Sequence, residues 1–199
     1  MKKIIIILVL LISTFFISNN SKVSVEKINL SLQENELGII FININNNNGL
    51  LLSLNNKNIL YLIKYSNYDD IFKFLNPLNI NIDYTIMNSD YNVVGNKIVF
   101  NDYLYLNNIT FNKKDYIIIN YNDQTLCINP TYNNCDYIYY TYDTKFYIND
   151  YTKIFIYNDI INKDKFYDKW VDSYKISKNN YTILKIKDTY EVLEIPKNI

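Results

Sequence analysis

Short apolar runs separated by asparagine-rich polar stretches follow one another along most of the chain. The first clear runs are residues 37–44, 50–54 and 58–63. The polar stretches Asn45–Gly49 and Asn55–Lys57 separate them, and the Asn-Gly dipeptide in the first stretch is a strong turn signal. We therefore expect three strands joined as an antiparallel meander.

The same strand pattern continues to the end of the chain. Further strands are expected at 82–87, 97–100, 103–106, 109–111, 115–120, 124–128, 136–141, 145–148, 153–157, 181–186 and 190–195. No long linker, charge block or repeat divides the sequence, so residues 22–199 are predicted to form a single globular domain.

Two stretches have helical spacing instead. Ser66 or Asn67 is expected to cap a short helix that has acidic residues in its first turn and stops at Pro77. A second helix is predicted over residues 163–174, because aromatic and aliphatic residues recur there on one face. The expected fold class is a mixed, strand-dominated α+β domain.

The first residues have the composition of an export segment. Lys2 and Lys3 precede the apolar run at residues 4–17, and a polar stretch follows it. The run is short for a membrane span, which needs roughly 17–25 residues. We expect residues 1–21 to act as a cleaved signal peptide or as an uncleaved membrane tether. In either case the domain would be extracytoplasmic, secreted or held at the outer face of the membrane.

Cys127 and Cys135 are the two cysteines of the chain, eight positions apart. In an oxidising compartment they could close a small loop as a disulfide. The alternative is a pair of unpaired buried thiols. No metal-binding or redox motif surrounds them.

Composition excludes several classes of function. The chain has 199 residues, with no histidine and no arginine, and its 20 basic residues balance 20 acidic ones. Ser-His-Asp and Cys-His catalysis and histidine-bound metal are therefore excluded, and there is no basic field that would gather nucleic acid. We attribute much of the high asparagine content to AT-rich coding.

Three segments together resemble a known family. Residues 40–52 read IFININNNNGLLL, residues 55–60 read NNKNIL, and residues 83–95 read DYTIMNSDYNVVG. Their order and spacing are similar to the metallo-β-lactamase-fold hydrolase domain of DNA-internalisation competence proteins, and the similarity extends over about residues 36–195. The resemblance implies a shortened four-layer αββα sandwich. The alternative architecture is an all-β sandwich with two peripheral helices.

The resemblance also implies where the family's metal site would lie. The loops that hold the family's metal ligands correspond here to Ser89, Asp90, Tyr91, Asn92 and Val93, to Asn129-Pro130, and to Tyr142-Asp143. The family mechanism needs imidazoles and carboxylates around two metal ions. Because the chain has no histidine, the resemblance implies a degenerate domain that is not an enzyme and holds no cofactor.

The function expected from these patterns is a non-catalytic binding or interaction role at the cell surface. The partner would be a protein or a small molecule of unknown identity. One alternative is an unrelated exported β-rich binding or structural module. Another is a histidine-free hydrolase in which Asp90 and Asp143 hold a hard cation through oxygen ligands.

Overall fold

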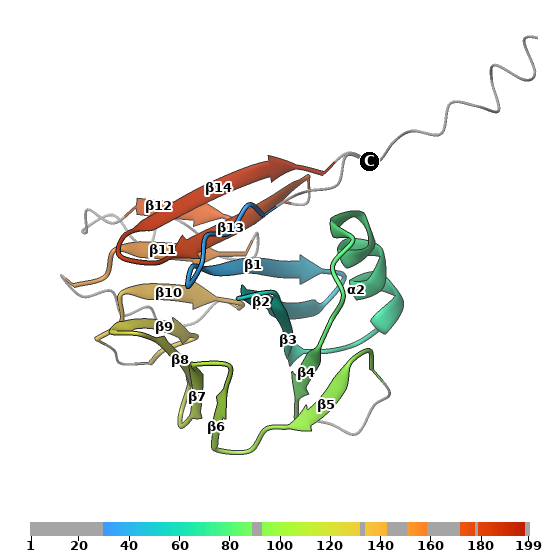
Figure 1. Cartoon of the computed structure of the whole chain (residues 1–199), viewed down its shortest axis with the longest axis horizontal. Helices are drawn as coiled ribbons and strands as arrows, with labels where there is room; N and C mark the ends of the chain where they lie inside the picture. Colours follow the sequence, from blue (N-terminus) through green and yellow to red (C-terminus); the bar gives the residue numbers. More distant parts are fainter. Residues whose placement is uncertain are drawn as a thin grey trace, which may run out of the picture.

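The strands of the protein form two mixed sheets (Figure 1). The structure is a computed structural model, and it describes residues 30–88, 93–131, 134–142, 151–158, 172–177 and 179–197. In the first sheet the described strands have the order β14-β13-β1-β2-β3-β4-β5, and in the second β12-β11-β10-β9-β8-β7-β6.

The strand bounds follow the apolar runs of the sequence closely. The first sheet contains β1 (Leu37–Ile44), β2 (Asn47–Leu54), β3 (Lys57–Lys64), β4 (Tyr84–Met87), β5 (Asn96–Val99), β13 (Asn180–Ile186) and β14 (Tyr190–Pro196). The second contains β6 (Tyr103–Leu106), β7 (Ile109–Lys113), β8 (Ile117–Tyr121), β9 (Gln124–Ile128), β10 (Tyr137–Tyr140), β11 (Ile154–Tyr157) and β12 (Asp172–Lys175). The strand expected at 145–148 lies outside the described residues.

The predicted antiparallel meander is confirmed, with one correction to its first turn. β1 pairs with β2 and β2 with β3, both antiparallel. Asn45 and Asn46 alone connect β1 to β2, with φ values of 45° and 65°, as in a two-residue hairpin turn. The turn predicted at Asn45–Gly49 is wrong in its second half, because Gly49 lies within β2. A Cβ on Gly49 would come 2.6 Å from the carbonyl oxygen of Tyr61. Glycine therefore allows β2 and β3 to lie close together at this position.

The two sheets repeat one arrangement of strands. Each has an antiparallel meander, β1-β2-β3 or β7-β8-β9, followed by strands that run parallel to its last member. The repeat extends to side chains. The carboxylate of Asp83 precedes β4 and accepts from the backbone N–H of Asn58 at 2.9 Å. That of Asp136 precedes β10 and accepts from the N–H of Thr125 at 2.9 Å.

The main core lies between the two sheets. Alternate residues of β1 and β2 meet alternate residues of β7, β9, β10 and β11 there. Its fully buried members include Ile39, Phe41, Leu50 and Leu52 from the first sheet and Ile109, Phe111, Tyr137, Tyr139 and Ile156 from the second. The opposite faces of the sheets are buried as well, which explains why the strands read as nearly continuous apolar runs.

Helix α2 (Tyr68–Leu75) covers the outer face of the first sheet (Figure 1). Asn67, one of the two caps that the sequence predicted, is the N-cap of this helix. Its Oδ1 accepts from the backbone N–H of Asp69 at 2.9 Å. Ile71, Phe74 and Leu75 are its buried residues. The predicted stop is confirmed, since the chain passes at Asn76 into the short 3-10 helix η1 (Asn76–Leu78).

The second predicted helix is wrong at its end. Residues 172–174 belong to β12, which pairs parallel with β11, and residues 163–171 lie outside the described residues. α2 is the one α-helix among the described residues, so two sheets and a single helical layer are what the structure shows. Residues 1–29 lie outside the described residues. Among the residues that are described, no helix is long and apolar enough to cross a membrane.

Candidate functional site

The resemblance places the former metal site at the carboxyl ends of the parallel strands. Tyr142 follows β10 and is exposed. Val93 is half-buried against the outer face of the first sheet. The remaining predicted residues of the two loops, Ser89, Asp90, Tyr91, Asn92 and Asp143, lie outside the described residues.

Neutral polar residues follow directly after three neighbouring strands at this edge. Asn129 comes after β9, Thr141 after β10 and Asn158 after β11. Because the three strands are parallel, these residues meet at one end of the second sheet. Asn48, at the start of β2, reaches the same place from the first sheet. We call these four residues the amide cluster.

Asn158 lies at the centre of the amide cluster and is fully buried. Its Nδ2 donates to the carbonyl oxygen of Thr141 at 2.7 Å and to Oδ1 of Asn48 at 3.1 Å. The second sheet is thereby joined to the first through a hydrogen bond between side chains 110 positions apart. Both hydrogens of this amide are used within the protein.

Asn129 and Thr141 pair through two hydrogen bonds. Oδ1 of Asn129 accepts from the backbone N–H of Thr141 at 2.7 Å, and its Nδ2 donates to Thr141 Oγ1 at 2.8 Å. Asn129 has a φ of 51°, in the left-handed region that asparagine tolerates. Asn129 thus joins the end of β9 to the end of β10.

Tyr139 brings a hydroxyl to the cluster from within the main core. Its oxygen lies 3.3 Å from the carbonyl oxygen of Ile42 and 3.4 Å from Oδ1 of Asn158. Burial raises the pKa of this phenol well above its ordinary value, so the hydroxyl stays neutral. It acts as a hydrogen-bond donor and not as a general base.

The amide of Asn47 organises the neighbouring loop. This residue is fully buried, and its Oδ1 accepts from the backbone N–H groups of Ser66 and Asn67 at 2.7 and 3.1 Å. The side chain of Ser66 adds a third bond at 3.2 Å. A neutral amide at the start of β2 therefore fixes the loop from which α2 begins.

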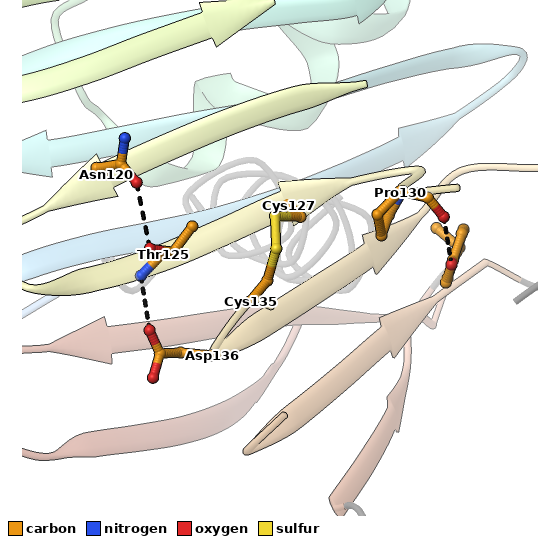
Figure 2. Close-up of a disulfide and its surroundings, with 7 residues drawn as sticks. Asn120, Thr125, Cys127, Pro130, Cys135 and Asp136 are labelled. Carbon is orange, nitrogen blue, oxygen red and sulfur yellow. Dashed lines mark hydrogen bonds between the residues drawn. A yellow bond between two sulfur atoms is a disulfide. The ribbon is translucent and has the colours of Figure 1, made fainter. Parts of the chain in front are cut away.

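A disulfide joins Cys127 on β9 to Cys135 just before β10 (Figure 2). Both residues are buried, and their Cα atoms are 6.0 Å apart. The bond closes the loop that carries Asn129 and Pro130. The carbonyl oxygen of Pro130 accepts from the hydroxyl of Tyr140 at 2.7 Å, which gives the loop a second link to β10.

The chemistry of the amide cluster is that of hydrogen bonding alone. Its side chains are amides and a hydroxyl, which neither titrate near neutral pH nor activate water. Among the described residues, no three of histidine, cysteine, aspartate and glutamate come close enough to hold a metal ion. Asn158 and Thr141 were missed by the sequence analysis, although a polar residue after a buried parallel strand is a detectable signal.

Comparison with known proteins supports the fold. No protein-family model matches the chain, and no curated protein sequence matches it. Among solved structures, the metallo-beta-lactamase fold protein YhfI from Bacillus subtilis is similar, with a TM-score of 0.51 and 8% sequence identity. The similarity covers 75% of this chain and 99% of YhfI. It shows a shared fold, and the finer resemblance to competence proteins stays a prediction.

Proposed function

We propose that this chain is a non-catalytic metallo-β-lactamase-like domain that works by binding, outside the cytoplasm. The observation that carries the proposal is the amide cluster. At the edge where the family resemblance puts metal ligands, Asn129, Thr141 and Asn158 bond to one another instead. These bonds join the ends of β9, β10 and β11 through neutral side chains.

A metal centre at this edge would have to displace that network. The chain has no imidazole to offer, and the oxygen Oδ1 of Asn129 and that of Asn48 already accept hydrogen bonds. An amide oxygen is also a weaker ligand than a carboxylate for a divalent ion that must lose its water. Hydrolysis by a metal-bound hydroxide therefore has no support among the described residues.

The proposed location outside the cytoplasm rests on two features. The apolar run at residues 4–17 follows two lysines, and the disulfide between Cys127 and Cys135 is a bond that persists in oxidising compartments. We further propose the four-layer sandwich as the full architecture.

The test of the non-catalytic role is a metal and activity measurement on the full chain. The purified protein is dialysed against Zn²⁺, Mn²⁺ or Mg²⁺, and its metal content is measured by mass spectrometry. Chromogenic phosphodiester, thioester and β-lactam substrates are then assayed with each metal. We expect less than 0.1 equivalent of bound metal and rates equal to those of the buffer.

A stoichiometric metal ion together with turnover would contradict the proposal. The double variant Asp90→Asn/Asp143→Asn would then identify the source of the activity. If the variant lost both metal and turnover, the protein would be a carboxylate-dependent hydrolase.

A further inference from the structure

Strand β6 forms one end of the second sheet (Figure 1). It pairs with β7 on one side, and none of the described strands pairs with its other side. The strands at the ends of the two sheets, as far as the structure describes them, are β5, β14, β12 and β6. Such an edge strand presents unpaired main-chain N–H and C=O groups, which can pair with a strand of another chain.

β6 lacks the features that keep other strands away from an edge. Charged residues and proline are common means of blocking such pairing. The other three edge strands carry them: Lys97 in β5, Asp172 and Lys175 in β12, and Glu191, Glu194 and Pro196 in β14. The sequence of β6 is Tyr-Leu-Tyr-Leu, with no charge and no proline.

The main-chain groups of Tyr103 and Tyr105 are the ones that point to the free side of β6. At the start of the hairpin, the backbone N–H of Lys113 donates to the carbonyl oxygen of Asp102 at 2.8 Å, and the pairing continues in the same register. Hydrogen-bonded pairs alternate with non-bonded pairs along an antiparallel ladder. Asp102 and Leu104 therefore bond to β7, and the N–H and C=O groups of the two tyrosines point away from it.

The side chains of β6 leave apolar surface open on both faces of the sheet. Leu104 and Leu106 pack against the main core, but both are only half-buried. Tyr103 and Tyr105 alternate with them, so they lie on the outer face, where their exposed fractions are 64% and 59%. A further strand beside β6 would cover surface on each face.

We propose that β6 pairs antiparallel with β6 of a second copy of this chain, which joins two second sheets into one. Leu104 of each copy lies opposite Leu104 of the other, next to the two-fold axis. Tyr103 then lies opposite Tyr105 of the other copy, and the four free main-chain groups of each strand are all used. Leucine packs on leucine at the inner face and tyrosine on tyrosine at the outer face.

A second copy is the favoured partner because this strand is complementary to itself. A two-fold axis at Leu104 keeps both faces of the sheet continuous, as an isologous interface requires. A shift by two residues would place Tyr103 opposite Asn107, which lies in the turn after β6. In the proposed register Asp102 lies opposite Leu106 of the other copy, so like charges do not meet.

The first test is a disulfide cross-link across the proposed axis in the full chain. Leu104→Cys places two thiols in a non-hydrogen-bonded pair, where Cα atoms are about 4.5 Å apart, within the range of a disulfide. Leu106→Cys is the matched control, because it lies on the same face but about 13 Å or more from its equivalent. The native cysteines are already paired with each other. After mild oxidation we expect a dimer on a non-reducing gel from Leu104→Cys alone.

The second test leaves the core-facing leucines unchanged. Tyr103→Lys/Tyr105→Lys places lysine opposite lysine in the proposed pairing, and Tyr103→Glu/Tyr105→Glu places glutamate opposite glutamate. Both positions are exposed, so the fold should tolerate either pair. Phe72→Lys/Tyr142→Lys, at two exposed aromatic residues outside β6, is the control.

The readout of the second test is sedimentation equilibrium in a mild detergent that keeps residues 1–21 dispersed. The concentrations run from about 5 μM to 1 mM, because so small an interface is at the weak end of specific association. We expect the parent chain and the control to dimerise reversibly. Each charge variant should lose about tenfold in association constant, and an equimolar mixture of the two should regain it.

Four results would overturn the proposal. The parent chain stays monomeric over the whole concentration range, or both cysteine variants cross-link equally. The lysine and glutamate variants fail to associate when they are mixed, or the control loses association as much as they do, which would place the contact elsewhere. None of these results depends on metal content or turnover, so this inference and the proposed function can fail separately.

Discussion

Asparagine carries much of the local geometry of this protein. Left-handed backbone occurs at Asn35, Asn45, Asn46, Asn55, Asn56, Asn79, Asn107, Asn108, Asn122 and Asn129. Asparagine tolerates this region better than other residues with a Cβ, so it serves in turns where glycine is common elsewhere. The asparagines, whose number we attribute largely to coding bias, therefore have structural roles both in the turns and in the amide cluster.

The amide cluster gives a prediction at the scale of one residue. Asn158→Ala removes the donor from the carbonyl oxygen of Thr141 and from Oδ1 of Asn48. Buried acceptors left without a partner cost about 1–3 kcal/mol. We expect that loss in the free energy of unfolding, measured by urea denaturation. An equal stability of the variant and the parent chain would show that the cluster is dispensable.

A companion variant separates shape from charge. Asn158→Asp keeps the shape but buries a carboxyl group whose pKa in the folded state would be raised by burial. Such a group destabilises the fold as pH rises above the pKa of the unfolded chain. The variant should therefore unfold at higher urea at pH 4.5 than at pH 7.5. Unchanged midpoints would mean that the site admits water.

At the scale of elements, most strands were predicted correctly because the local pattern of apolar and polar residues is enough to mark them. The strands near 37–44, 103–106 and 124–128 are short apolar runs bounded by polar turns, and the structure has them at or close to the same bounds. The helix predicted over 163–174 fails at its end for a non-local reason. Residues 172–174 become a strand because β11 offers them a parallel partner, which no local pattern reveals.

The candidate site was predictable only in part. The place of Asn129 was implied by the family resemblance, whereas the pairing of Asn158 with Asn48 depends on how two sheets stack. The internal repeat was not detected from the sequence for a similar reason. Asp83 and Asp136 hold equivalent places and each precedes a tyrosine, but the residues that donate to them, Asn58 and Thr125, differ.

The aspartate that precedes β4 gives a prediction on pH. The pKa of Asp83 is lowered, first by the N–H of Asn58 and then by Lys57. A carboxyl group with a lowered pKa adds stability above its unfolded pKa and loses it as pH falls. Asp83→Asn should therefore flatten the acid side of the stability profile, measured by urea denaturation from pH 6 to pH 2. Asp115→Asn, at an exposed site, is the control and should leave the profile unchanged.

The disulfide gives a second prediction for elements. Cys127 and Cys135 close a small loop between β9 and β10. Chain-entropy arguments give about 2–3 kcal/mol for a loop of this size. Cys127→Ala/Cys135→Ala should lose about this much stability in urea denaturation, and a reducing agent should then have no further effect. A loss from the reducing agent in the variant would point to a cause other than this bond.

At the scale of the whole molecule, the core depends on tyrosine. Tyr61, Tyr137, Tyr139, Tyr140 and Tyr181 are among the largest fully buried side chains. The exposed fraction of each is near zero, so their rings supply core volume that leucine or phenylalanine supplies in other proteins. Many of their hydroxyls find backbone carbonyls, as Tyr181 does at Phe74, at 3.0 Å.

This tyrosine core predicts a loss of stability at high pH. Burial raises the pKa of Tyr61 and Tyr139 above that of an exposed phenol. A raised pKa means that stability is full below the unfolded value, about 10, and is lost as pH rises beyond it. Tyr139→Phe should make the loss between pH 9.5 and pH 11.5 shallower in urea denaturation. Tyr151→Phe, at an exposed site, is the control, and an equal effect of both variants would contradict the argument.

The pairing of β1 with β13 has a consequence for the order in which the chain can fold. Leu37 lies opposite Ile186, so β1 receives one of its two neighbours from β13, which is made much later. A ribosome that adds about 5–20 residues per second needs roughly 7–28 s to go from Ile44 to Ile186. Throughout that interval β1 has an unpaired edge with apolar residues on both faces. During synthesis this edge of β1 is therefore open to pairing with other strands until residues 180–186 are made.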